Sequence, residues 1–128
     1  MAVGRQELGR QVEDIVAGAL ARAGVAIVAR NARASGTRGE IDLIGLDAGE
    51  LVFVEVKGRR AGGRIGPERA ALAVTRGKQA KLRALARAWL ADHAGELPRY
   101  GGLRFDVVGV TVDGAGGVLD WEHLEGAF

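Results

Sequence analysis

The first third of the chain changes from a helical to a strand-like spacing of apolar positions. Over residues 7–23, apolar side chains recur every three or four positions, which predicts an amphipathic helix that ends at Gly24. Residues 25–30 predict a short strand, and residues 32–39 have the composition of a basic loop. We therefore expect one helix followed by the first strand of a sheet.

Two strongly apolar segments come next. Residues 41–46 and 51–57 are separated by residues 47–50, a length typical of a β-hairpin loop. Each segment places apolar side chains on both of its faces. Such strands belong in the middle of a sheet that is covered on both sides, so we expect a central hairpin.

The stretch after the hairpin predicts a loop and then a long helix. Residues 58–66 are rich in Gly and Arg and are expected to form a mobile loop, and Pro67 suits the first position of a helical turn. Residues 75–93 again show helical spacing. The expected inner stripe of this helix consists of Leu82, Leu85, Ala86, Trp89 and Leu90.

The last quarter of the chain predicts two strands. Residues 97–102 form a connection, residues 103–112 a strand, residues 114–117 a turn and residues 118–124 a final strand. The sequence shows no repeat, so residues 1–128 are expected to form a single domain. The order of elements predicts an α/β fold with a mixed central sheet of about five strands flanked by helices.

Composition narrows the functional classes. The chain has no cysteine, which excludes disulfides and thiolate metal sites, and no apolar run long enough to span a membrane. The N-terminal residues lack the apolar core of a secretion signal, so we expect a cytoplasmic protein with no membrane partner. Residues 1–104 hold all 18 Lys and Arg against 11 Asp and Glu, and this basic excess suits a polyanionic partner.

The predicted hairpin brings ionic side chains together at its open end. If the residues that flank the loop pair with each other, Asp42 lies opposite Glu55. The same register places Glu40 opposite Lys57. Opposed carboxylates repel, and burying both is unfavourable unless a cation compensates. Oxygen ligands of this kind suit Mg²⁺ or Mn²⁺, and Lys57 could orient a water or balance the charge on a reacting phosphate.

A solvated strand end is the alternative. In that arrangement Glu40 pairs with Lys57, and both opposed carboxylates face water. The metal site is favoured because the ionic residues converge at the end of a strand expected in the centre of the sheet, just before a Gly/Arg-rich segment. Glu13 lies at the margin of the first helix's apolar stripe. It could point toward the same site or be an ordinary boundary glutamate.

The histidines and tryptophans lie far from the acidic residues in the sequence. His93 and His123 are isolated, so we expect surface or hydrogen-bonded residues and not metal ligands. Trp89 and Trp121 are expected to be packing residues and not to stack on bases, and the helical spacing of Trp89 supports its placement in the core.

The hairpin sequence resembles that of a known family. Residues 39–44 (GEIDLI), followed by residues 51–57 (LVFVEVK), resemble the YraN-type family of small bacterial proteins, which is assigned to the PD-(D/E)XK nuclease superfamily. The resemblance covers nearly the whole chain. Further matching positions are Glu13, Arg30, Asn31, Arg33, Gly66, Pro67, Lys78, residues 104–108 and the ending Ala127-Phe128.

The resemblance implies a restriction-endonuclease-like core and metal-dependent hydrolysis of phosphodiester bonds. Asp42 and Glu55, 13 positions apart, would bind Mg²⁺ or Mn²⁺, and Lys57 would be the catalytic lysine. Glu13 would be an accessory catalytic and metal-site acid. Ile41 stands where the superfamily usually has a proline, a change that this family commonly tolerates.

Within the superfamily, the chain is similar to archaeal-type Holliday-junction resolvases, which are small, basic and dimeric. Lys78, Gln79 and Lys81 lie at the start of the second helix, where those enzymes carry Lys and Gln. Gln79 could hydrogen-bond an active-site water, and Lys81 could equally be a solvated residue. Gly58 departs from the pattern, because many relatives carry a hydroxyl residue there. The resemblance implies a nuclease that selects DNA structure, and it allows a homodimer.

Nucleic acid is therefore the expected partner, with DNA favoured over RNA. Two alternatives stay open: a non-catalytic nucleic-acid-binding module on the same fold, and a dimeric scaffold or interaction protein. Phosphate contacts give affinity without reading sequence. The residues expected to make them are Arg33, Arg38, Arg59, Arg60, Arg64, Lys78 and Lys81.

Overall fold

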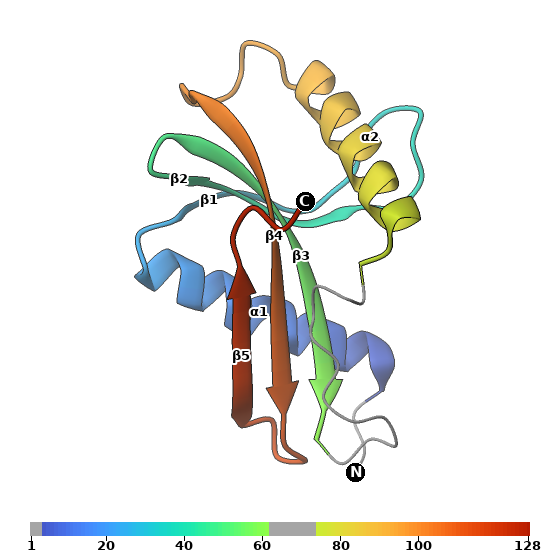
Figure 1. Cartoon of the computed structure of the whole chain (residues 1–128), viewed down its shortest axis with the longest axis vertical. Helices are drawn as coiled ribbons and strands as arrows, with labels where there is room; N and C mark the ends of the chain where they lie inside the picture. Colours follow the sequence, from blue (N-terminus) through green and yellow to red (C-terminus); the bar gives the residue numbers. More distant parts are fainter. Residues whose placement is uncertain (1–3, 62–73) are drawn as a thin grey trace.

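The structure, a computed structural model, describes residues 4–61 and 74–128. These residues contain two helices and five strands (Figure 1). Residues 62–66 of the predicted loop and the helical turn expected at Pro67 lie outside the described residues. The elements are α1 Arg5–Arg22, β1 Ala26–Ala32, β2 Ile41–Asp47, β3 Glu50–Arg60, α2 Arg76–Asp92, β4 Gly102–Val112 and β5 Val118–Leu124.

The five strands form one mixed sheet in the order β1-β2-β3-β4-β5. β3 and β4 are parallel, whereas the other neighbouring pairs are antiparallel. Parallel neighbours need a crossover connection, and α2 lies on the crossover between β3 and β4. The predicted α/β fold with a mixed central sheet flanked by helices is confirmed.

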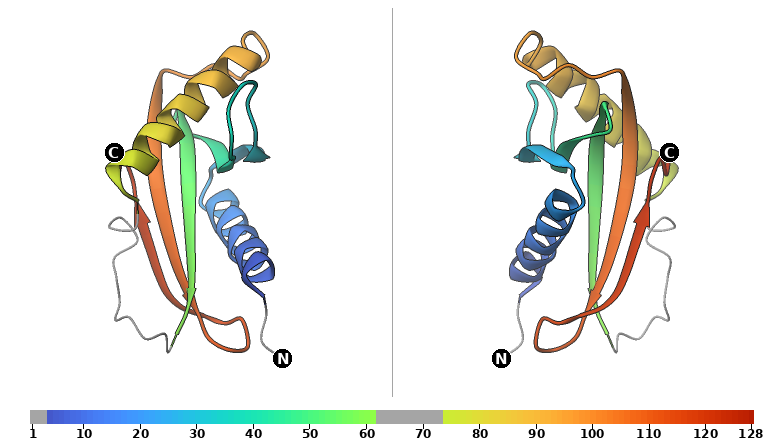
Figure 2. Two further views of the ribbon diagram at one scale, coloured as in Figure 1. Left: turned by 90° about the vertical axis from the view of Figure 1, so that its right-hand side faces the viewer. Right: turned by 90° about the vertical axis from the view of Figure 1, so that its left-hand side faces the viewer.

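The helices cover opposite faces of the sheet, as the two side views in Figure 2 show. On one face, Val12 of α1 packs in a cluster with Val54 of β3. On the other face, Leu85 and Trp89 of α2 pack in a cluster with Phe53 of β3. Successive residues of β3 therefore point to opposite faces and are buried on both, as the apolar pattern predicts.

Both helices begin and end close to their predicted bounds. Thr75 caps α2, because its hydroxyl oxygen accepts a hydrogen bond from the N–H of Lys78 at 3.2 Å. The chain turns away from α1 at Gly24, whose φ of 99° favours a residue without a Cβ. In the described part of the chain, neither helix combines the length and the apolar character needed to cross a membrane.

β2 and β3 form the predicted hairpin in the predicted register. Their backbone pairing runs from Leu43–Val54 to Asp47–Glu50. The turn is therefore residues 48–49 alone, and both have positive φ values, 49° and 84°, as a type I′ turn requires. The connection is shorter than the expected four residues because Asp47 and Glu50 pair with each other and so belong to the strands.

β3 continues beyond the predicted strand. Composition predicts a mobile loop for Gly58, Arg59 and Arg60, but they pair in parallel with residues 110–112 of β4. The prediction is wrong because β4 offers backbone partners along its whole length, and this tertiary pairing overrides local composition. Gly58 also has a packing role, since a Cβ there would lie 2.7 Å from the Cγ2 atom of Val12. The absence of a side chain lets α1 approach β3.

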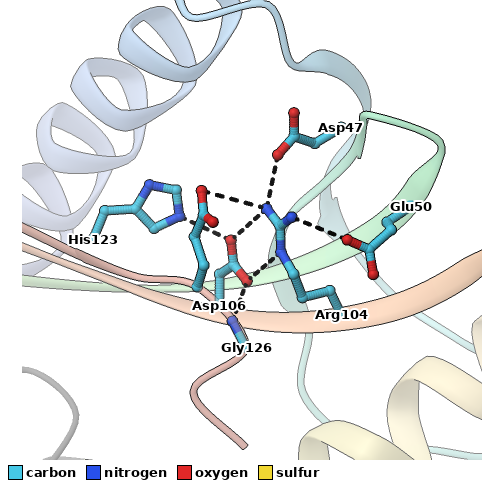
Figure 3. A network of polar contacts seen from close by, with 7 residues as sticks. Asp47, Glu50, Arg104, Asp106, His123 and Gly126 are labelled. Atoms are coloured by element: carbon cyan, nitrogen blue, oxygen red, sulfur yellow. Dashed lines mark hydrogen bonds and ion pairs between the residues drawn. The ribbon is translucent and has the colours of Figure 1, made fainter.

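A buried carboxylate ties β4 to β5 and to the end of β2 (Figure 3). Asp106 is 1% exposed and accepts hydrogen bonds from Arg104 Nε at 2.9 Å and from the N–H of Gly126 at 3.0 Å. His123 Nε2 lies 2.8 Å from its second oxygen, and Arg104 also contacts Asp47 at 2.9 Å. Burial alone would raise the pKa of Asp106, but these hydrogen bonds, that of Arg104 foremost, lower it overall. His123 is a hydrogen-bonded residue, as predicted.

The remaining histidine and the two tryptophans differ in their surroundings. Trp89 is 3% exposed, which confirms its placement in the core, and His93 stacks on its ring. Trp121, on β5, is 37% exposed and is therefore not a core residue as Trp89 is. The reason is topological, since β5 is an edge strand of the sheet.

Candidate active site

The backbone pairing of β2 with β3 stops one residue before the predicted acidic pair. Leu43 and Val54 are the last partners in this ladder. Asp42 turns its carboxylate onto the neighbouring backbone, where Oδ2 accepts a hydrogen bond from the N–H of Val56 at 2.8 Å. Asp42 and Glu55 therefore lie at the point where the two strands separate.

Three acidic residues interact at this point. Burial, followed by the negative charge of Glu55, raises the pKa of Asp42 from its ordinary 3.8 to about 7. Glu13 of α1 acts in the same direction through its charge and a side-chain hydrogen bond, whereas the N–H of Val56 opposes the rise. The structure thus brings together Glu13, Asp42 and Glu55, and a positive charge among them would stabilise their ionised forms.

Two lysines share the carboxylate of Glu55, which is 8% exposed. The Nζ atom of Lys78, in the first turn of α2, lies 2.8 Å from Oε1, and the Nζ atom of Lys57 lies 3.4 Å from the same oxygen. Burial and the proximity of Lys78 lower the pKa of Lys57. Burial alone would also lower the pKa of Lys78, but its hydrogen bond to Glu55 raises it overall. Lys78 therefore makes the closer ion pair with Glu55, and Lys57 the more distant one.

A second set of polar contacts involves Glu13 and the end of β1. The Nδ2 atom of Asn31 lies 3.2 and 3.3 Å from the two carboxylate oxygens of Glu13 and 3.4 Å from Oε1 of Glu40. Arg33 lies 3.6 Å from the other oxygen of Glu40. Glu40 therefore contacts residues of β1 and its following loop, so the expected placement of Glu40 opposite Lys57 is wrong. The strands have already separated before that position.

Gln79 lies one residue beyond Lys78, at the start of α2. Its Nε2 atom donates a hydrogen bond to the carbonyl oxygen of Val74 at 3.2 Å. Val74 is buried and packs with Leu82 and Val107. These contacts fix the helix start that carries Lys78 to Glu55, while a contact between Gln79 and an active-site water stays a prediction.

The other basic residues expected to bind nucleic acid occupy several elements. Arg59 and Arg60 lie on the half of β3 beyond Glu55. Arg64 lies outside the described residues. Those with exposed side chains are Arg33, Arg38 and Lys81. The described members of this set therefore lie on three parts of the chain: the segment between β1 and β2, β3 and α2.

The side chains that could hold a divalent cation are those of Asp42, Glu55 and Glu13. Within residues 4–61 and 74–128, no three Asp, Glu or His side chains are already grouped as a metal centre. The donor chemistry nevertheless fits, because carboxylate oxygens are the ligands that Mg²⁺ and Mn²⁺ prefer. The mutual repulsion that raises the pKa of Asp42 also favours a cation. Binding requires Glu55 to exchange part of its contact with Lys78 for the ion.

Sequence reasoning missed two contacts of the site. It placed Lys78 at the start of the second helix and assigned it to phosphate binding, but it did not predict the contact of Lys78 with Glu55. It included Asn31 only as a matching position of the family. Asn31 has a φ of 49° within a strand, a conformation that Asn tolerates better than most residues. An Asn between basic residues just before the hairpin was the available indication.

Comparison with known sequences identifies the family of the chain. The sequence model of the uncharacterised protein family UPF0102 matches residues 12–110, which span the site from Glu13 to Lys78. The chain belongs to the UPF0102 family. This confirms the YraN-type resemblance at the level of the family.

Members of the UPF0102 family from three bacteria are similar to the chain along almost its whole length. The UPF0102 protein of Streptomyces griseus subsp. griseus is 44% identical over 122 residues, covering 95% of this chain and 96% of the relative. That of Rhodococcus jostii is 44% identical over 121 residues, with 94% and 95% covered. That of Frankia alni is 44% identical over 124 residues, with 97% and 96% covered.

Proposed function

We propose that this UPF0102 protein is a divalent-metal-dependent nuclease that hydrolyses phosphodiester bonds in DNA. The observation that carries the proposal is the convergence of three carboxylates and Lys57 where β2 separates from β3. Carboxylates that repel one another attract a cation, and an adjacent lysine attracts a phosphate. The two kinds of group that metal-assisted phosphodiester hydrolysis uses, carboxylates for a cation and a lysine for the phosphate, would both come from this end of the strands.

The acidic residues would hold Mg²⁺ or Mn²⁺. Asp42 and Glu55 are the ligands proposed, with Glu13 as an accessory acid. When bound, such a cation polarises a phosphate and makes water a stronger nucleophile. The backbone N–H of Val56 orients Asp42, and Asn31 orients Glu13, so these two acids are already positioned by a neighbour.

The lysines would act on the phosphate. Lys57 is partly exposed beside Glu55, where its ammonium group can orient the attacking water and stabilise negative charge on the reacting phosphate. Lys78 contacts the same carboxylate oxygen of Glu55 as Lys57 does. It would transfer its hydrogen bond from Glu55 to a phosphate oxygen when DNA is bound.

The proposed substrate is recognised by its backbone and shape. The basic residues near the site carry charge without a motif that reads base edges, so binding should depend strongly on salt. The resemblance to Holliday-junction resolvases supports a preference for branched DNA and action as a homodimer. Both belong to the proposal, as does a cytoplasmic location.

A cleavage assay at low salt tests the proposal. Labelled single-stranded, duplex, flap and four-way-junction DNA, together with RNA, are incubated with the protein in Mg²⁺ or Mn²⁺. Cleavage of at least one DNA is expected, and EDTA should abolish it. Asp42→Asn, Glu55→Gln and Lys57→Ala should each remove activity while circular dichroism shows an intact fold. If all three variants unfold, these residues are structural and the site assignment fails.

A non-catalytic nucleic-acid-binding module is the second candidate. The contacts of Glu55 with Lys57 and Lys78 favour it, because they already compensate one of the three acidic charges. Calorimetric titration with Mn²⁺ separates the two functions. A nuclease should bind Mn²⁺ and lose affinity on Glu55→Gln, whereas a binding module should bind DNA in a salt-sensitive way without Mn²⁺ binding or cleavage. A dimeric scaffold should show neither.

A further inference from the structure

A polar groove opens beside the acidic cluster. It has a volume of about 480 Å³ and lies between the N-terminal half of α1, β1 and the segment that precedes β2. Glu13 lines it and also interacts with Asp42, so the groove leads directly to the proposed site of hydrolysis. Its lining residues are Gln6, Gly9, Arg10, Glu13, Asn31, Arg33 and Glu40.

The lining can hold both parts of a nucleotide. The guanidinium groups of Arg10 and Arg33 suit phosphate oxygens, and the amides of Gln6 and Asn31 suit the polar edges of a base. The charge of Glu40 is offset by its contact with Arg33 at 3.6 Å and by Asn31. The groove therefore offers hydrogen-bond donors to an anion, and the negative charge of Glu40 in its wall is already compensated.

Gly9 is the second observation that points to a ligand. It lies in the interior of α1, where glycine destabilises a helix relative to alanine. Packing does not explain it, because a Cβ at this position would meet no atom within 4 Å. A side chain there would project into the groove. The glycine weakens the helix and keeps the groove open.

Asn31 supports the same interpretation from the opposite wall. Its φ of 49° places a strand residue in the left-handed region, which is unfavourable for a residue with a side chain. This conformation accompanies the contacts of its amide with Glu13 and Glu40. The amide of Asn31 is therefore held at the groove wall, next to Glu13 and Glu40.

We propose that this groove is a substrate subsite that binds a single-stranded nucleotide next to the scissile phosphate. Arg10 and Arg33 hold its phosphate, and the amide of Asn31 or Gln6 contacts its base. The inference rests on the proposed nuclease function and specifies its substrate as one with an unpaired nucleotide next to the scissile phosphate. A substrate with a single-stranded or unstacked junction fits it.

Filling the groove from Gly9 tests the subsite. Affinity for a short fluorescein-labelled single-stranded DNA is measured by anisotropy at low salt, with Ca²⁺ in place of Mg²⁺. Affinity should fall in the order Gly9→Ala, Gly9→Leu, Gly9→Trp, with about a tenfold loss for Trp. Helix distortion predicts no such order, because Ala and Leu are better helix formers than Gly. Unchanged affinity in Gly9→Trp would overturn the subsite.

An arginine pair supplies the matched control. Arg10→Ala should weaken binding. It should also reduce the slope of the logarithm of the dissociation constant against the logarithm of salt concentration by about one. Arg22→Ala, an exposed arginine at the far end of the same helix, should change neither. Equal effects of the two variants would overturn the subsite alone. If the wild-type protein neither binds nor cleaves DNA, the subsite and the proposed function fail together.

Discussion

The Nζ atom of Lys78 lies 2.8 Å from the Oε1 atom of Glu55, joining the first turn of α2 to the point where β3 leaves β2. Glu55 is almost fully buried, so this contact compensates a charge that water cannot reach. It also competes with any cation that uses the same oxygen. The two roles of Glu55, partner of a lysine and ligand of a metal, can be separated by experiment.

Lys78→Met should strengthen Mn²⁺ binding and weaken the fold. Removing a neighbouring ammonium group relieves roughly 1 kcal/mol of repulsion, which corresponds to about fivefold tighter binding. Loss of the ion pair should lower the free energy of unfolding in EDTA. Calorimetry and urea denaturation measure the two effects, with Arg87→Met, an exposed residue on the same helix, as the control. Weaker Mn²⁺ binding in Lys78→Met would show that Lys78 supports the metal site.

Asp42→Asn should stabilise the metal-free protein at high pH. Asp42 has a pKa of about 7 when folded and 3.8 ordinarily, so the unfolded chain releases this proton first and wild type loses stability as pH rises between these values. Asn resembles the protonated acid. In EDTA at pH 8 the variant should be more stable by on the order of 2 kcal/mol.

The comparison at low pH controls for other effects of Asp42→Asn. Near pH 4 the carboxyl group is protonated in the folded wild type, so the two proteins should differ little in melting temperature. The charged groups that act on Asp42 are Glu55 of β3, Glu13 of α1 and Lys78 of α2. If the difference in stability between wild type and Asp42→Asn is the same at pH 4 and pH 8, the pKa of Asp42 is not raised in the folded protein.

Gly58→Ser should destabilise the protein despite restoring the hydroxyl expected from the resemblance. The new Cβ would meet Val12 at 2.7 Å, and overpacking of this kind costs about 1–3 kcal/mol. Combining it with Val12→Ala should recover part of the loss, since the smaller side chain makes room. Denaturant unfolding of the single and double variants measures the coupling. If the losses in free energy of unfolding of the two single variants simply add in the double variant, the introduced serine does not clash with Val12.

The sequence predicted the hairpin and its register because two strongly apolar segments flank a loop of hairpin length, and pairing the residues next to the loop, Leu46 and Leu51, sets all the other pairs. The position of Asp42 relative to Glu55 followed from that register. The Asp42–Val56 hydrogen bond did not, because it forms where the backbone pairing of β2 with β3 ends, and no local pattern marks that end.

Other features depended on elements far apart in the chain. Arg59 and Arg60 have loop-like neighbours, and only their pairing with β4 makes them strand residues. The sequence gives no sign that Asp106 is buried. Its burial depends on hydrogen bonds with Arg104, His123 and Gly126, which come from different parts of the chain. Contacts of this kind have no local pattern, so the sequence predicted the site's acids better than their partners.

Asp106→Asn should lower the free energy of unfolding by about 3 kcal/mol at neutral pH, because it removes the charge that Arg104 and His123 face in a buried position. The pKa of Asp106 is lowered in the folded protein, so this stability is present above 3.8 and is lost as pH falls further. The difference between wild type and variant should therefore shrink in acid. Urea unfolding at pH 7 and pH 3 measures it, and an equal difference at both pH values would contradict the account.

The initial rate of DNA cleavage in Mn²⁺, compared between wild type and Lys57→Ala, tests the central claim most directly. Lys57 contacts Glu55 but lies outside the hydrophobic clusters, so its replacement should leave the fold intact by circular dichroism. We expect metal-dependent cleavage by the wild type and a loss of at least about a hundredfold in the variant. Equal rates for two folded proteins, or no cleavage by the wild type of any DNA structure, would contradict the assignment of this site as a nuclease centre.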